Sequence, residues 1–305
     1  MPDRKSSFFI FLSLAGMLVA CAQGVPSSQP SPIPSTPSPL PEKKLEYDLH
    51  KLPRSIVHTL KIPAQSQFVV TTAVSSKLQT VEEFADSSQA IAVLNGGFFD
   101  PENQKSTASI FQNGQQIAKP EDNDRLMNNL NLLPYLDRIL NRSEFRRYQC
   151  GSSQQYDITP RQELPPTDCQ LQDALGAGPQ LLPFSTLREE GFLDGQNGTV
   201  IRDALGHNQP NARSAIGITR DGSLLLVLAS QNPDNSTNSG LSILELTDFM
   251  KKQGVEKALN LDGGTSSALF FQGETFYGKV NESGEPIARP VKSVLLVKST
   301  KKPEQ

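Results

Sequence analysis

The chain has 305 residues, a formal net charge of −3, three cysteines and three histidines. Its lysines and arginines are scattered and form no basic patch, which argues against a nucleic-acid partner. No two histidines share a short motif and no cysteine has metal-ligand spacing, which argues against a histidine-based zinc site.

The first 20 residues are predicted to be a lipoprotein signal peptide. Arg4 and Lys5 precede an apolar run over 8–18, which is too short for a membrane span. The run leads through Leu18-Val19-Ala20 to Cys21, an arrangement that resembles the lipobox of bacterial lipoproteins, in which the cysteine carries lipid after cleavage. We therefore expect lipidation of Cys21 and an exported, membrane-anchored lipoprotein at the cell envelope. The alternative is an ordinary cleaved signal in which Cys21 is incidental.

A tether and one folded domain are predicted to follow. Residues 21–46 form the tether, because 26–41 consists mostly of proline and serine and holds too little apolar surface to fold. The folded domain is predicted over 47–298, a size that fits a single domain, with a tail over 299–305.

The first half of the domain is predicted to contain strands, a short helix and an insert. The apolar runs 68–74 and 90–94 indicate strands, and a short helix is expected over 81–84 between them. Asn113-Gly114 between apolar pairs predicts a hairpin. Residues 121–170 are polar and are expected to form an insert at the edge of the domain, either as a lid or as decoration.

Inside this insert, a helical pattern over 126–140 is interrupted by Pro134. Cys150 and Cys169 form an even pair in a chain expected to be exported, which predicts a disulfide that closes the insert. Two free thiols are the alternative.

The second half of the domain predicts more strands and one longer helix. Asp221-Gly222 is expected to join two strands as a hairpin, and Ser242 with Glu245 forms a capping box for a helix that ends at Gly254. Many strands with few helices predict an α+β fold, with a mixed β-sheet core and flanking helices. The further apolar runs expected as strands are 212–219, 224–229, 258–261, 268–271 and 294–297.

Four segments share one pattern, in which a strand is followed by a polar residue and small residues. Glycine N–H groups at such loop mouths can form an anion nest, and an arginine offers a fork of donors that suits a phosphate. Each segment alone is typical of an ordinary turn. The four segments are Asn95-Gly96-Gly97, Gly176-Ala177-Gly178-Pro179, Ala212-Arg213-Ser214 and Asp262-Gly263-Gly264-Thr265-Ser266-Ser267.

In this order, and with their flanking residues, the four segments resemble the phosphodiester glycosidase family over about 91–297. The resemblance implies an α+β domain that hydrolyses a sugar-1-phosphodiester. Thr265 stands where a third glycine is common and Ser214 where threonine is common, which leaves the substrate open. Phe98 and Phe99 after the first segment are expected to belong to the core.

Asp262, Asn95 and Arg213 are the predicted catalytic residues. We expect Asp262 to act at the anomeric carbon as nucleophile or as base for water, and Arg213 with the glycine N–H groups to hold the phosphate. Asp100 and Asp203 are candidates for a second carboxylate. The predicted substrate-binding residues are Gly96, Gly97, Gly176, Gly178, His207, Ser214, Gly263, Gly264, Thr265 and Ser266.

The expected function is an extracytoplasmic hydrolase that cleaves the anomeric C–O bond of a glycosyl phosphodiester in envelope or exported polysaccharide. Its partners would be a phosphorylated glycan and, through the lipid anchor, a membrane. No cofactor is required by the sequence, although Asp262 with Asn95 could instead bind calcium or magnesium through oxygen ligands. The alternatives are a non-catalytic glycan-binding or polysaccharide-assembly lipoprotein, and a phosphodiesterase that cleaves the P–O bond.

Overall fold

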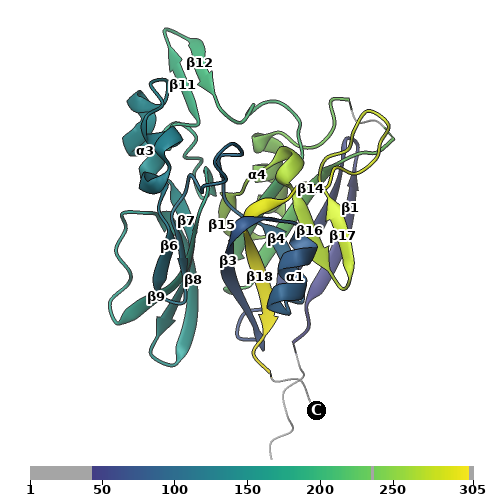
Figure 1. The fold of residues 1–305 in the computed structure, drawn as a ribbon. Coiled ribbons are helices and arrows are strands. Elements are labelled where there is room, and N and C mark those ends of the chain that lie inside the picture. The colour runs from purple at the N-terminus through teal and green to yellow at the C-terminus, as the bar shows by residue number, and fades with distance from the viewer. Residues whose placement is uncertain (1–42, 235–236, 302–305) are drawn as a thin grey trace, which may run out of the picture. The chain divides into compact units, whose positions relative to one another are not determined.

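The computed structural model describes residues 43–234 and 237–301 (Figure 1). The predicted signal peptide, the cysteine expected to carry lipid and most of the predicted tether lie outside the described residues. From Glu42 onward the chain forms one unit. No helix in the described part is long and apolar enough to cross a bilayer.

Two antiparallel sheets form the centre of the domain. The first has the strand order β1-β2-β14-β13-β15-β10, and the second has the order β17-β16-β4-β18-β3. The strands of the first sheet are β1 Glu46–Leu52, β2 Ser55–Ile62, β10 Gln180–Leu182, β13 Arg213–Thr219, β14 Leu224–Gln231 and β15 Val255–Asn260. The strands of the second are β3 Phe68–Gln79, β4 Ala92–Asn95, β16 Ala268–Phe271, β17 Glu274–Tyr277 and β18 Val291–Ser299.

Strand β14 is buried along its whole length, and its first six residues are apolar, as expected of a strand with both faces buried. In β14, Leu224, Leu226 and Leu228 enter the core between the two sheets, whereas the alternating residues Leu225 and Val227 enter a second core on the outer face. A third core lies on the outer face of the second sheet. Side chains alternate between the faces of a strand, so one apolar run supplies two cores.

One helix covers each outer face. Helix α4, Ile243–Lys252, buries Leu246 and Met250 in the core outside the first sheet, and helix α1, Val81–Ser88, buries Phe84 outside the second. The capping box predicted for α4 is present, and a second capping box begins α1. The domain is therefore layered as helix, sheet, sheet, helix.

A third antiparallel sheet, ordered β6-β5-β9-β7-β8, lies beside these layers (Figure 1). Buried Asp173 on β9 joins it to β3, because its carboxylate accepts a hydrogen bond from Thr72 Oγ1 at 3.2 Å and pairs with Arg147 at 2.5 Å. The strands are β5 Ile110–Gln112, β6 Gln115–Ala118, β7 Ser143–Cys150, β8 Ser153–Pro160 and β9 Cys169–Gly176.

The predicted disulfide is confirmed, and it joins Cys150 to Cys169, which are register partners on β7 and β9.

The predicted helical pattern in the insert is also present, as short helices. A separate hairpin, formed by β11 and β12, lies beside these short helices (Figure 1). The remaining elements are the 3-10 helices Pro120–Asp122, Leu133–Tyr135 and Gly264–Ser266, the helices α2 Asp124–Met127 and α3 Leu136–Leu140, and the strands β11 Leu193–Gln196 and β12 Thr199–Asp203.

Two fold expectations need correction. The α+β class holds in outline, since strands hold 46% and helices 14% of the described residues. The expected mixed β-sheet core, however, consists of several antiparallel sheets, because hairpins and neighbouring strands pair antiparallel in the described part. The stretch 121–170 is not an edge decoration, because it contributes β7 and β8 to the third sheet and Phe145 to the central core.

Gly97 is required by the close approach of the segment after β4 to the end of β9, and Gly97→Ala should strongly destabilise the domain. A Cβ at this position would lie 2.2 Å from the carbonyl oxygen of Gly176, a backbone atom that cannot move alone. We expect a loss of about 3 kcal/mol in the free energy of unfolding, measured by chemical denaturation with the disulfide intact. Gly151→Ala is the control, because its Cβ would enter open space and only its positive φ of 59° opposes alanine. Equal losses in the two variants would show that the close approach is not the cause.

Candidate active site

The predicted site residues meet at one end of the sheet sandwich. Strand β13 runs antiparallel to β15, so its first residue, Arg213, lies beside the last residues of β15 and the following Asp262. Strand β4 of the other sheet ends at the same place, where the N–H of Asp262 donates to the carbonyl oxygen of Gly96 at 3.0 Å. Segments far apart in the sequence are thereby joined around Asp262.

Asn95 holds this junction together from the inside. It is completely buried, its Nδ2 donates to the carbonyl oxygen of Asp262 at 2.7 Å, and its Oδ1 accepts from Ser214 Oγ at 2.6 Å and from the N–H of Ala268 at 3.1 Å. The expected direct contact of Asn95 with substrate is therefore corrected to a positioning role. Ser214, expected to bind substrate, has the same role.

A cavity of about 360 Å³ opens at this junction. Asp262 supplies the one carboxylate among its described lining residues, and Arg142, Arg202 and Arg213 supply three guanidinium groups. The other lining residues are Phe98, Phe192, Ala204, Leu205, Asn211, Asn260, Leu261, Gly263 and Gly264. An excess of positive charge around one carboxylate suits an anionic ligand with a reacting centre beside the anion.

The expected anion nest of glycine N–H groups is wrong, because all six N–H groups already have acceptors within the protein. Gly263, for example, donates to Asp262 Oδ1 at 2.9 Å, and Gly264 donates to the carbonyl oxygen of Ala212 at 2.9 Å. These glycines instead permit close backbone packing. The other four glycines, with their acceptors, are Gly96 with Ser293 O, Gly97 with Ser293 Oγ, Gly176 with Ser109 O and Gly178 with Asn260 O.

The three arginines are anchored by backbone carbonyl groups and leave terminal nitrogens free. Arg142 Nε donates to the carbonyl oxygen of Glu190 at 3.2 Å, and Arg202 Nε donates to that of Gly191 at 2.6 Å. Neither forms an ion pair or another hydrogen bond with any described residue through its terminal nitrogens. Arg142 also lies over the ring of Phe192, 3.7 Å from its centroid. These guanidinium groups are therefore fixed in position and keep hydrogen-bond donors available for a ligand.

Arg213 is buried and holds a loop as well as facing the cavity. Its Nε donates to Leu241 O at 3.1 Å, while its Nη2 donates to three carbonyl oxygens of the loop at Leu205, Gly206 and Gln209, at 3.1, 3.1 and 3.0 Å. Its Nη1 has no hydrogen-bond partner among the described residues. Burial lowers the pKa of Arg213 to about 10 and, with the neighbouring Arg202, that of Arg142 to about 9, so both stay charged at neutral pH.

Asp262 has the electrostatic properties of a reactive carboxylate. Burial raises its pKa to about 6, against the opposing effects of hydrogen bonds from Ser266 and Gly263 and of the charge of Arg289. Perturbed carboxyl groups in a cavity are concentrated at functional sites. Arg289 also donates to Thr265 Oγ1 at 2.8 Å, which ties the predicted substrate-binding residue Thr265 to this charge.

Comparison with known proteins identifies the family. The family model described as phosphodiester glycosidase matches residues 88–298, about two thirds of the chain. This chain belongs to the phosphodiester glycosidase family. The resemblance of the four segments is thereby confirmed.

Individual relatives of this chain are distant or matched in part. An N-acetylglucosamine-1-phosphodiester alpha-N-acetylglucosaminidase from Mus musculus is 36% identical over 66 residues, which are 22% of this chain and 12% of that protein. The match therefore spans a small share of the mouse protein.

Solved structures show the same fold. The catalytic domain of the zebrafish N-acetylglucosamine-1-phosphodiester alpha-N-acetylglucosaminidase, auto-inhibited by its pro-peptide, superposes with a TM-score of 0.60 at 16% identity, covering 85% of this chain and 84% of that chain. A hypothetical protein from Synechocystis superposes with a TM-score of 0.55 at 15% identity, covering 83% of this chain and 61% of that chain. At these identities the likeness concerns the fold alone.

Several predicted residues of the phosphodiester glycosidase domain do not line the cavity. His207 Nδ1 pairs with Asp203 at 3.0 Å, and the N–H of His207 donates to the same carboxylate. Asp100 pairs with Arg125 at 2.8 Å in a loop. Asp100 and Asp203 therefore do not supply the expected second carboxylate to the cavity, and His207 does not face the expected phosphate.

The alternative role of Asp262, metal binding together with Asn95, is not supported by the hydrogen bonds of Asn95. Asn95 Oδ1 is occupied by two donors, so it is not available to share a cation with Asp262. Within residues 43–234 and 237–301, no group of three or more His, Cys, Asp or Glu side chains is arranged as a metal site.

The structure adds residues that sequence reasoning missed. Arg142 lies between α3 and β7 within the insert and Arg202 lies on β12, and neither stands in a strand-then-small-residue pattern that would single it out. Phe98, expected in the core, lines the cavity and packs on Phe192 with ring centroids 5.6 Å apart. Asn260 fixes the turn beside Asp262 by donating from Nδ2 to Gly178 O at 2.9 Å.

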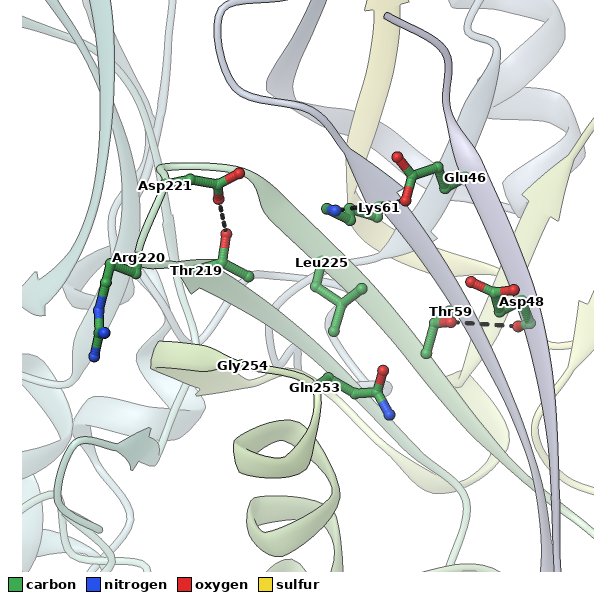
Figure 2. Close-up of a pocket in the computed structure, with 10 residues that line it drawn as sticks. All are labelled: Glu46, Asp48, Thr59, Lys61, Thr219, Arg220, Asp221, Leu225, Gln253 and Gly254. Atoms are coloured by element: carbon green, nitrogen blue, oxygen red, sulfur yellow. Dashed lines mark hydrogen bonds and ion pairs between the residues drawn. The ribbon is translucent and has the colours of Figure 1, made fainter.

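A second hollow, of about 540 Å³, lies over the outer side of the first sheet near the end of α4 (Figure 2). Its charges are already partly paired, because Lys61 lies 3.4 Å from Glu46 and the carboxylate of Asp221 accepts a hydrogen bond from Thr219 Oγ1. None of the predicted site residues lines it. The cavity at Asp262 remains the candidate active site.

Proposed function

We propose that the protein hydrolyses a sugar-1-phosphodiester at the anomeric C–O bond, with Asp262 acting at the anomeric centre and three arginines binding the phosphate. The observation that carries this proposal is the cavity in which Arg142, Arg202 and Arg213 surround a single carboxylate whose pKa is raised. Family membership supports the reaction class.

The arginines would stabilise the transition state more than the substrate. A phosphodiester carries one negative charge, whereas the phosphate monoester released on C–O cleavage approaches two at neutral pH. Negative charge therefore accumulates on the phosphate as the bond breaks, next to Arg142, Arg202 and Arg213. Fixed donors directed at developing charge are an effective source of catalysis.

Asp262 would activate the group that attacks the sugar. A pKa of about 6 leaves most of the carboxylate ionised at pH 7, as a base or nucleophile requires. In the base route, Asp262 takes a proton from water, the water oxygen bonds to the anomeric carbon, and the C–O electron pair leaves with the phosphate. Because a phosphate monoester is a good leaving group, a second carboxylate acting as acid is not needed.

Hydrolysis in oxygen-18 water tests the bond assignment. With a methyl glycosyl phosphodiester, C–O cleavage places the label in the sugar, and we expect that outcome. Label in methyl phosphate would identify a P–O cleaving phosphodiesterase. Binding without turnover, across gluco-, galacto-, manno- and 2-acetamido-gluco-configured substrates, would support the glycan-binding alternative.

We also propose that the enzyme acts outside the cytoplasm, on envelope or exported polysaccharide, as a lipoprotein anchored through Cys21. The lipobox-like residues before Cys21 and the disulfide between Cys150 and Cys169 support export, because disulfides persist in oxidising compartments. Cys21→Ser should release the protein from membranes into the soluble extracytoplasmic fraction. Retention of that variant in the membrane fraction would contradict the anchor.

A further inference from the structure

We propose that the phosphate ester partner of the sugar carries an apolar chain, which lies on an exposed apolar rim beside the cavity. This inference rests on the proposed function, because it concerns the far side of the same phosphate. The rim consists of Val200 and Ile201 on β12 with Leu130 and Leu133 of the insert.

The rim gathers exposed apolar side chains on the two elements that supply arginines to the cavity. Of the nine large apolar side chains that are exposed in the described part of the chain, four belong to it, with exposures of 54% and 57% for Val200 and Ile201 and of 79% and 49% for Leu130 and Leu133. Single exposed apolar residues are ordinary, whereas a group beside a cavity indicates a binding surface.

The rim residues lie close in the chain to Arg202 and to the residue that Arg202 contacts. Arg202 follows Ile201 directly and lines the cavity, and its guanidinium group lies 4.7 Å from the ring centroid of Tyr135. Tyr135 ends the 3-10 helix that begins at Leu133, so the hairpin contacts the insert within one helical turn of Leu133. Figure 1 shows the hairpin projecting beside α3.

The hairpin has no structural use for its apolar residues. Among the described strands, β11 and β12 pair only with each other, so no further described strand covers Val200 or Ile201. The register slips opposite Ile201, between Asp194 and Gly195, and such bulges redirect side chains next to active sites. A ligand whose phosphate sits on Arg202 would extend its ester group toward this rim.

The chemistry of the rim selects the class of ester group. Beyond Arg202, Val200 and Ile201 present hydrocarbon, which favours an alkyl or polyprenyl chain over a sugar. The reaction is unchanged, with the C–O bond cleaved and the chain leaving as its phosphate monoester. We therefore infer that the enzyme prefers a lipid-linked sugar phosphate to a phosphodiester with a small polar ester group.

The test compares methyl and octyl glucosyl phosphodiesters, below the micellar concentration of the octyl compound, on the soluble domain. We expect kcat/KM to be about tenfold or more higher for octyl, since burial of two of its extra methylenes is sufficient for this. The double variant Val200→Ser with Ile201→Ser should lose most of the octyl preference and keep its activity on the methyl compound. Leu49→Ser with Ile117→Ser, which removes exposed apolar residues from β1 and β6, should keep the preference.

Each outcome is decisive. Hydrolysis of the methyl compound without any preference for the octyl compound would overturn the proposal of an apolar chain. A preference that survives in the rim variant would also overturn it. A rim variant that loses binding to phosphatidylglycerol vesicles while its octyl preference is unchanged would assign the rim to a bilayer surface and also overturn it. If the enzyme hydrolyses neither compound, and also none of the galacto-, manno- and 2-acetamido-gluco-configured phosphodiesters, the result would instead count against the proposed function.

Discussion

Asp262→Asn is expected to lower kcat/KM on a glycosyl phosphodiester by at least about 100-fold, because the amide can neither accept a proton nor attack the sugar. The substitution keeps the shape of the side chain, and its Oδ1 can still accept the hydrogen bond from Gly263. Steady-state kinetics on the purified soluble domain measure the loss. A rate near that of the wild type would remove Asp262 from the catalytic role.

The pH dependence separates the roles open to Asp262. If it acts as base or nucleophile, kcat/KM should fall about tenfold per pH unit below pH 6, because protonation removes the active form. If it acts as a general acid, activity should instead fall above pH 6. A flat profile from pH 4 to 8 would contradict both roles.

The same variant should be more stable than the wild type at neutral pH. The folded-state pKa of Asp262 is about 6, above the ordinary aspartate value of 3.8, so the folded protein binds the proton more tightly than the unfolded chain. This contribution to stability is complete below pH 3.8 and is lost as the pH rises through 6. At pH 7.5 the buried charge costs up to about 3 kcal/mol, so Asp262→Asn should raise Tm by several degrees, with little change near pH 3.8. An unchanged Tm at both pH values would argue against the raised pKa.

The sequence predicted those parts of the fold that are determined locally. The capping box at Ser242 and Glu245 and the hairpin at Asn113-Gly114 involve residues close in sequence, and both are present. Strand β7 was missed because its sequence contains Glu144, Arg146 and Arg147 and reads as polar. These residues are buried through ion pairs with one another or with partners on other strands, which no local pattern reveals.

The candidate site likewise has one part that the sequence predicted and one part that it did not. The junction around Asp262 was predictable, because each of its segments lies at an end of a strand and contains small residues that let the sheets end close together. The source of the positive charge was not, because Arg142 and Arg202 are brought to the cavity by the insert and by the hairpin. The glycines were assigned the wrong role, since a glycine that permits close packing and one that offers a free N–H look alike in a sequence.

Arg142→Gln is expected to lower kcat/KM on the phosphodiester by about 100-fold, mainly through kcat, because the guanidinium group stabilises charge that develops on the leaving phosphate. Arg142 is a cleaner probe than Arg213, whose three hydrogen bonds to the carbonyl groups of Leu205, Gly206 and Gln209 also hold that loop. Inorganic phosphate should inhibit the wild type competitively and the variant much more weakly. The kcat/KM of Arg142→Lys, which keeps the charge without the fork of donors, should lie between those of the wild type and Arg142→Gln.

The matched control is Arg138→Gln, one turn earlier in the insert. Arg138 is exposed, does not line the cavity and lies 5.7 Å from the ring centroid of Tyr135. It should retain both activity and inhibition by phosphate, so any loss through general damage to the insert would appear there too. A neutral aryl glycoside of the same sugar should be hydrolysed at similar rates by the wild type and Arg142→Gln, because its leaving group carries no phosphate. Equal losses on the two substrates, with unchanged inhibition by phosphate, would show that Arg142 shapes the cavity without binding the anion, and the phosphate would then depend on Arg202 and Arg213.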